Sequence, residues 1–115
     1  MAESYRELIV WQRGMDLVES VHRVSRGWPR EELYGLTNQI RRAAVSVRAN
    51  IAEGQGRAGA REFLHHLSIA KGSLHEIETH LLIAQRLDYH SAETSQALLQ
   101  QSADVGRLLL GLIKS

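Results

Sequence analysis

Four features are scarce or missing in this chain of 115 residues, and each shortage narrows the possible folds. It has no cysteine, which excludes disulfides and thiolate metal sites. A single proline and an aromatic content of 5% leave little material for a turn-rich all-β fold. No apolar run approaches the roughly 20 residues that span a bilayer. These shortages favour a helical protein without a membrane-spanning segment.

The overall composition is that of one globular domain, residues 1–115, with 43% hydrophobic and 23% charged residues. The formal net charge of +1 does not by itself indicate a nucleic-acid partner. Charged residues at Glu3, Arg6 and Arg13 interrupt the N-terminal segment, so it lacks the apolar core of a signal peptide. We therefore expect a cytoplasmic protein.

Apolar residues recur at every third or fourth position in four segments, which predicts four amphipathic helices. The predicted ranges are 8–26, 36–54, 60–87 and 92–114. Pro29 separates the first two helices, and Ser91 or Ser95 is suited to cap the fourth. Short connections and the absence of a strand pattern predict an all-α, antiparallel up-and-down four-helix bundle.

The second predicted helix carries a polar stripe beside its apolar stripe, and polar residues on a flank of the third helix could meet it. The set comprises Arg42, Ser46, Asn50, Glu53, Ser73 and Glu76. One interpretation is a structural network that sets the register of the two helices, because buried polar groups need partners. The other is a small-molecule or catalytic pocket lined by Arg42, Asn50, Glu53 and Glu76. The structural interpretation is preferred, since such networks often imitate active sites.

Each predicted helix has an apolar seam, the stripe of apolar residues that faces the core. Some apolar and small residues lie outside these seams, and a single bundle cannot bury every face of its helices. They are Val45, Ala49, Ala52, Ile69 and Ile83. Gly72, in the middle of the third helix and opposite its seam, also suggests a close approach by another helix. These residues predict self-association.

Four arginines lie on or just after the second predicted helix and are candidates for nucleic-acid contact. They are Arg41, Arg48, Arg57 and Arg61. In one copy they form a modest basic patch. In a ring, symmetry would place the same arginines on every subunit, and together they would form a continuous positive surface that could follow a phosphate backbone. The alternative is that they pair with nearby glutamates and serve solubility.

The six histidines do not form a metal site by their spacing. No two histidines of the third helix are four residues apart. The Glu-x-x-His pairs Glu19–His22 and Glu62–His65 do not make the full ligand set of a di-iron bundle, because Glu62 and His65 flank the apolar seam rather than share it. We expect solvated histidines, no metal and no cofactor. Because no Ser/His/Asp set or suitably placed carboxylate pair is present either, we expect no enzymatic activity.

Several segments together resemble a known family over nearly the whole chain. They are VWQRGMDLV, QIRRAAVSVRANIAEG, EFLHHLSIAKGSLHEIETHL and LLLGLI. The family comprises the small four-helix-bundle proteins encoded within intervening sequences of bacterial 23S rRNA genes, and its most specific motifs match Arg41 to Gly54 and Ile69 to Thr79. Many members have proline where this chain has Arg48, which predicts a straighter second helix or a more basic surface here.

The resemblance implies a bundle that assembles into a ring of five subunits. It also implies similarity to the accessory protein of diversity-generating retroelements, which binds nucleic acid and a reverse transcriptase. The expected function is therefore a non-enzymatic homo-oligomeric scaffold that binds RNA or a nucleoprotein without reading sequence. A protein–protein interaction module without a nucleic-acid role is the alternative, and an enzyme using the Arg42, Asn50, Glu53 and Glu76 cluster is the least favoured.

Overall fold

The computed structural model describes residues 5–56 and 59–114. Within them the chain is all-α, with no β-strand. The helices are η1 (Tyr5–Glu7), α1 (Ile9–Ser25), η2 (Arg30–Glu32), α2 (Leu36–Gln55), α3 (Ala60–Arg86) and α4 (Ala92–Lys114), where η denotes a short 3-10 helix. The bounds of the four α-helices differ from the ranges expected from sequence by at most one residue at either end.

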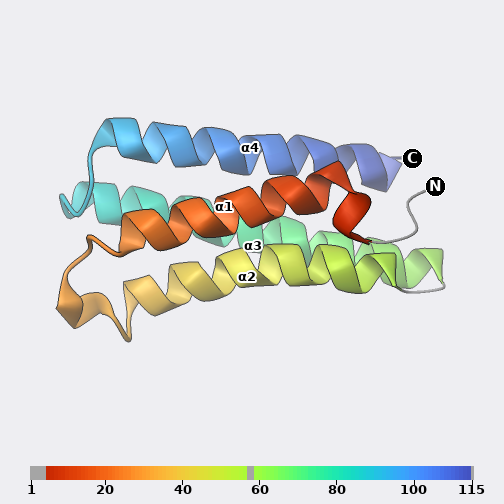
Figure 1. Cartoon of the computed structure of the whole chain (residues 1–115), viewed down its shortest axis with the longest axis horizontal. Coiled ribbons are helices and arrows are strands. Elements are labelled where there is room, and N and C mark those ends of the chain that lie inside the picture. The colour runs from red at the N-terminus through yellow and green to blue at the C-terminus, as the bar shows by residue number, and fades with distance from the viewer. Residues whose placement is uncertain (1–4, 57–58, 115) are drawn as a thin grey trace.

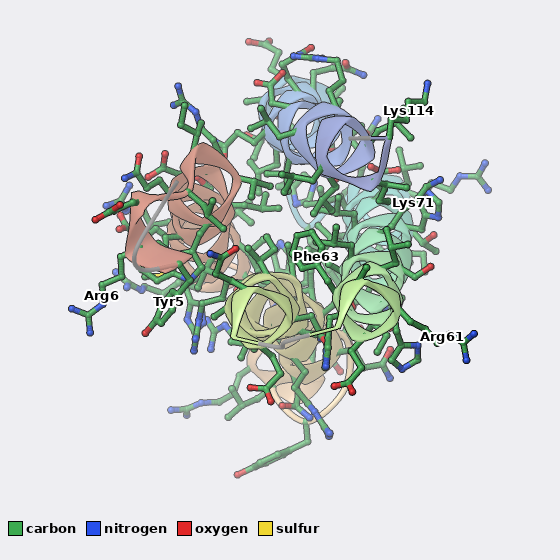
Figure 2. The ribbon with its side chains drawn as sticks, turned by 90° about the vertical axis from the view of Figure 1, so that its right-hand side faces the viewer. Tyr5, Arg6, Arg61, Phe63, Lys71 and Lys114 are labelled. Atoms are coloured by element: carbon green, nitrogen blue, oxygen red, sulfur yellow. The ribbon has the colours of Figure 1, made fainter. Side chains whose placement is uncertain are left out.

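The four α-helices lie lengthwise beside one another and enclose one core (Figure 1). The α1–α2 and α3–α4 connections lie at one end of the molecule, and the adjoining ends of α2 and α3 lie at the other. Seen along its length, the molecule has α1, α2, α3 and α4 in order around the core, into which Phe63 points (Figure 2). Each helix thus packs against two others.

The core consists of aliphatic side chains at helical spacing. The largest of those less than 2% exposed are Leu17, Val21, Ile40, Val47, Ile51, Leu67, Leu74, Ile77, Leu81, Val105 and Leu109. Complete burial of one such side chain contributes about 1.5–3 kcal/mol, so these residues dominate the stability of the fold. The expected apolar seam of α3 is buried from Leu67 to Ala84, whereas Phe63 at its start is only partly buried.

Glycines determine how closely two of the helix pairs approach. A Cβ atom on Gly54 of α2 would lie 3.1 Å from the Cβ of His66 and 3.2 Å from Cδ1 of Phe63, so α3 leaves no room for a side chain. Gly14 of α1 faces Arg48 of α2 at ordinary contact distance. Gly72 differs, because a Cβ atom there would meet nothing within 4 Å. The expected close approach to Gly72 is therefore wrong for contacts within the described chain.

Side chains close the end of the bundle where the α1–α2 and α3–α4 connections lie. The hydroxyl of Tyr89 donates a hydrogen bond of 2.7 Å to Glu32. The other carboxylate oxygen of Glu32 accepts from the backbone N–H of Leu36 at 3.2 Å, which satisfies a free donor at the start of α2. At the start of α4, Ser91 accepts from the backbone N–H of Thr94 at 3.1 Å and is therefore the cap.

Candidate functional site

A chain of hydrogen bonds joins the facing sides of α2 and α3. Ser73 donates to the hydroxyl of Ser46 at 2.8 Å. The amide nitrogen of Asn50 donates to the Ser46 carbonyl at 2.9 Å and to its hydroxyl at 3.2 Å. The amide oxygen of Asn50 lies 2.9 Å from Nδ1 of His66. Since that oxygen can only accept, His66 carries a proton on Nδ1. This chain fixes the register of the two helices.

Next to this chain of hydrogen bonds, α2 and α3 form an open groove of about 360 Å³. Its lining consists of Asn38, Gln39, Arg42, Ala43, Ser46, Ser73 and Glu76. Within the described ranges, Arg42 and Glu76 form no hydrogen bond or ion pair, and both are exposed. Asn50 and Glu53 do not line the groove. The structure thus brings only two members of the possible catalytic set into one groove.

Among the described residues, the groove holds no activated nucleophile. The hydroxyls of Ser46 and Ser73 bond to each other, and the further side-chain partner of Ser46 in this part of the chain is the Asn50 amide. Neither contact supplies a base that could accept a hydroxyl proton. What the groove presents is one cation, one anion and several neutral hydrogen-bonding groups, which suits recognition of a polar surface.

His80 lies one turn beyond Glu76 on α3, and its Nδ1 atom is buried without a hydrogen-bond partner among the described residues. Burial lowers the pKa of His80, and the nearby carboxylate of Glu76 opposes this effect only in part. In residues 5–56 and 59–114, no group of three or more acidic or histidine side chains is placed to hold a metal ion.

Arg41, one of the four candidate arginines for nucleic-acid contact, forms contacts within the molecule. Its Nε–H donates to the hydroxyl of Ser25 at 2.9 Å, and its Nη2 donates to the carbonyl of His22 at 3.5 Å. Both acceptors lie in the last turns of α1, where a positive charge is favourable next to the free carbonyls of a helix C-terminus. Arg41 therefore ties α2 to α1. Sequence analysis missed this role, because the residues involved lie on different helices.

The other three candidate arginines occupy different settings. Arg48 is half-buried, and its Cβ lies where α2 packs against Gly14 of α1. Arg61, in the first turn of α3, is exposed and extends away from the helices (Figure 2). Arg57 lies outside the described residues. The structure therefore does not show the four arginines as one patch.

The structure also contains a polar cluster that sequence analysis missed. His90 contacts Trp28 through one ring nitrogen and Ser95 through the other. Trp28 and Ser95 are buried. The prediction of solvated histidines holds for His65 and His75, which are exposed. It is wrong for His80, whose Nδ1 is buried, and for His90, whose two ring nitrogens both have partners within the molecule. No local pattern links Trp28 to a residue so far along the chain.

None of the helices in the described part of the chain is both long enough and apolar enough to cross a membrane. No curated protein sequence matches the chain. Among solved structures, it is similar to the crystal structure of a protein of unknown function from the S23 ribosomal protein family of Bacteroides thetaiotaomicron VPI-5482. The TM-score is 0.85 at 23% identity, over 93% of this chain and 100% of the other, and this likeness supports the fold alone.

The sequence pattern of one family covers nearly all of the chain. The pattern describes the 23S rRNA-intervening sequence proteins and matches residues 6–111. This range includes all of α1, α2 and α3 and most of α4. It also includes the polar contacts between α2 and α3. The chain therefore belongs to the family of 23S rRNA-intervening sequence proteins.

Proposed function

We propose that this protein is a non-catalytic subunit of a homo-oligomeric scaffold, an antiparallel up-and-down bundle that assembles into a ring of five. The observation that carries the proposal is the exposure of large aliphatic side chains on regular helix surfaces. Val45 of α2 is 37% exposed, and Ile69 and Ile83 of α3 are 38% and 39% exposed. An isolated bundle leaves this apolar surface in water, whereas self-association buries it.

The absence of catalysis is supported by the groove between α2 and α3. Its two serine hydroxyls are hydrogen-bonded to each other without a base, and its charged residues, Arg42 and Glu76, are not joined to them. An acyl-transfer or hydrolytic mechanism needs a nucleophile with a base in hydrogen-bond reach. The groove instead suits contact with a partner macromolecule.

The proposed partner of the ring is RNA or a nucleoprotein, bound without reading sequence. Arg48 and Arg61 are the described arginines that support this role, because the ion pairs found among the described residues involve Arg13, Arg23 and Arg107 instead. A ring would repeat them by symmetry and increase the number of phosphate contacts in proportion. The family description, which refers to sequences within 23S rRNA, is consistent with an RNA partner.

One observation favours a second candidate, a protein–protein interaction module without an RNA role. Arg41 is held by Ser25 and His22, so one of the expected phosphate contacts is compromised. A scaffold with few free arginines would bind a protein partner through its apolar and groove surfaces.

Light scattering tests the assembly. At micromolar concentration we expect a particle with five times the chain mass of 12.9 kDa. A monomer mass over the whole concentration range would refute the scaffold proposal.

RNA titrations at low and moderate salt test the partner. We expect weak binding that decreases with salt, and a further decrease in the Arg48→Ala/Arg61→Ala double variant. Arg23→Ala is the matched control, because Arg23 is exposed on α1 and paired with Glu19. Absence of binding at low salt would contradict the RNA role and leave the protein-interaction module as the function.

A further inference from the structure

A pocket of about 350 Å³ lies at the end of the bundle where α1 passes into α2. Its lining residues come from one continuous stretch of the chain, residues 25–41. This stretch contains the last residue of α1, the connection with η2, and the first turns of α2 (Figure 1). Among the described residues, none lines both this pocket and the groove between α2 and α3, so the two sites are separate.

Three arginines line the pocket, Arg26, Arg30 and Arg41, and no acidic residue of the described chain lines it with them. Arg26 and Arg30 are exposed, and the ion pairs found in the described part of the chain involve other arginines. Arg41 is held in place by its bonds to Ser25 and His22. Burial and then the positive charges of Arg41 and Arg26 lower the pKa of His22, so these two charges act on the same part of α1. The lining therefore carries three positive charges without a carboxylate among them.

The nearest negative groups are engaged elsewhere or lie outside the pocket. Glu31 and Glu32 are the acidic residues closest in sequence, and neither lines it. Glu32 accepts hydrogen bonds from the Tyr89 hydroxyl and from the backbone N–H of Leu36. Three of the last carbonyl groups of α1 accept from the backbone N–H groups of residues 26–28. An anion in the pocket would therefore meet donors rather than these acceptors.

Thr37, in the first turn of α2, adds a hydroxyl group to the lining. The residue is only 3% exposed, and its hydroxyl has no hydrogen-bond partner among the described residues. It is therefore free to donate to a ligand in the pocket. Arg41 lies four residues further on, so the two side chains share one face of α2. The first turn of a helix also favours an anion, because the positive end of the helix dipole lies there.

This set of donors suits a phosphate monoester. Guanidinium groups bind phosphate oxygens through two parallel N–H bonds. A phosphate monoester carries a charge of about −1.5 to −2 near neutral pH and offers three acceptor oxygens. A diester within a nucleic-acid strand carries only about one negative charge. Three arginines and a hydroxyl around one small pocket therefore match a monoester better than a diester.

The remaining lining is apolar and consists of Trp28, Pro29 and Leu33. Leu33 is 45% exposed, which leaves it accessible to a ligand. The volume lies near the lower end of the roughly 300–1,000 Å³ of small-molecule sites, so the pocket has room for more than a phosphate group. An apolar or planar group on the ester side of the phosphate can pack against this wall. A nucleoside is a group of this kind.

We propose that the pocket binds the 5′-phosphate of a nucleotide, with Arg26, Arg30 and Thr37 as donors and Arg41 as a fixed positive charge beside them. The site goes beyond the proposed scaffold function, because it needs neither the ring nor Arg48 and Arg61. Two sources present the same chemistry, a free nucleoside monophosphate and the 5′ end of an RNA strand.

Calorimetric titration of the full chain with adenosine 5′-monophosphate (AMP) tests the site. We expect saturable binding that is at least about tenfold tighter than that of adenosine or of 3′,5′-cyclic AMP, whose phosphate is a diester. Arg30→Ala should weaken AMP binding about tenfold or more, as the loss of a hydrogen bond to a charged group implies. Arg86→Ala is the matched control, because Arg86 is an exposed arginine at the end of α3 that does not line the pocket.

Three outcomes of this titration overturn the proposal. They are the absence of AMP binding up to millimolar concentration, equal binding of AMP and adenosine, and an equal loss of affinity in Arg30→Ala and Arg86→Ala. None of them bears on assembly, which light scattering measures separately.

Thr37→Val distinguishes a ligand contact from a structural role. The substitution keeps the shape of the side chain and removes the hydroxyl. Since this hydroxyl has no partner among the described residues, the free energy of unfolding should not fall. AMP affinity should fall by about tenfold. A less stable variant with unchanged AMP affinity would show that the hydroxyl serves the fold, and it would overturn the proposed site.

Two oligoribonucleotides of one sequence, one with a 5′-phosphate and one with a 5′-hydroxyl, identify the source of the ligand. Tighter binding of the phosphorylated strand, lost in Arg30→Ala, assigns the pocket to RNA ends. Equal binding of the two strands, together with saturable AMP binding, assigns it to a free nucleotide. Both results support the site. A protein that binds AMP but neither assembles nor binds the 5′-hydroxyl strand would refute the proposed function and leave this inference standing.

Discussion

The indole Nε1–H of Trp28 donates a hydrogen bond of 3.1 Å to Nδ1 of His90, 62 residues further along the chain. The two rings are also stacked, with centroids 5.8 Å apart. The other ring nitrogen of His90, Nε2, lies 2.6 Å from the hydroxyl of Ser95. Nδ1 can accept from Trp28 only when it carries no proton, so His90 must be neutral with its proton on Nε2. This contact joins the α1–α2 connection to the start of α4.

We predict that stability falls as the pH is lowered below about 6.5, with His90 as one cause. Burial lowers the pKa of His90 below its ordinary value of 6.5. At pH values between the folded-state pKa of His90 and 6.5, the unfolded chain binds more protons at this residue than the folded chain does. The contribution of neutral His90 to the free energy of unfolding is therefore complete above pH 6.5 and is lost as the pH falls toward the folded-state pKa. Burial also lowers the pKa of His80. The pKa of His22 is lowered first by burial and then by the positive charges of Arg41 and Arg26. Denaturant unfolding at several pH values measures the effect.

His90→Phe separates the contribution of His90 from the others. The variant keeps a stacking ring but leaves the Trp28 N–H without its acceptor, so we expect a loss of about 1–3 kcal/mol near neutral pH. We also expect a shallower decline of stability toward acid. His75→Gln, at an exposed position on α3, should change neither quantity. A decline as steep in His90→Phe as in the unmodified protein would show that His90 does not titrate in this range.

Two glycine substitutions should have opposite effects on stability. Gly54→Ala forces a Cβ atom to within 3.1 Å of the Cβ of His66, and we expect a loss of about 1–3 kcal/mol from overpacking. Gly72→Ala meets nothing within 4 Å and should stabilise the helix by about 0.5–1 kcal/mol. The free energy of unfolding measures both. Equal effects of the two variants would mean that α2 and α3 do not approach closely at Gly54.

The Ser46–Ser73 hydrogen bond should appear as a coupling energy. Ser46→Ala and Ser73→Ala should each destabilise the protein by about 1 kcal/mol. The double variant should cost less than the sum of the two, by about 0.5 kcal/mol or more, because the second substitution removes a group that has already lost its partner. Strict additivity in a double-mutant cycle would indicate that the two hydroxyls do not bond in solution.

Arg41 and Arg61 should differ in stability and in RNA binding. Arg41→Ala removes the contacts with Ser25 and His22 and should lower the free energy of unfolding by about 1–3 kcal/mol. Arg61→Ala changes an exposed side chain and should stay within about 0.5 kcal/mol of the unmodified protein. In RNA titrations the order should reverse, with the larger loss of affinity in Arg61→Ala. A smaller stability loss in Arg41→Ala than in Arg61→Ala would contradict the structural role of Arg41.

The helices and most of the core could be predicted from the sequence because both depend on local spacing. The apolar repeat from Leu67 to Ala84 defines the buried side of α3 without reference to any other helix. Ser91 caps α4 through a contact three residues away, which is also a local pattern. Ser46 and Ser73 were expected to meet because each lies beside the seam of its own helix, and they do.

The candidate site was harder to predict because its members belong to different helices. Spacing along one helix gives the direction of each side chain, but it does not give the rotation or the offset of the neighbouring helix. Asn50 thus proved to bond His66, and Glu53 lies away from the groove that Arg42 shares with Glu76. Spacing along α2 makes Arg41 a candidate for nucleic-acid contact, but in the structure its side chain donates hydrogen bonds to Ser25 and His22 in the last turns of α1.

The sequence by itself therefore determined the fold class, the helix bounds and the buried side of each helix, because helical periodicity acts within one segment. Only the tertiary structure decided which polar residues became partners. The close approach of α2 to α3 at Gly54 sets their offset, and that offset pairs Asn50 with His66. The contact of Trp28 with His90 likewise arises only when the two connections are brought to the same end of the bundle.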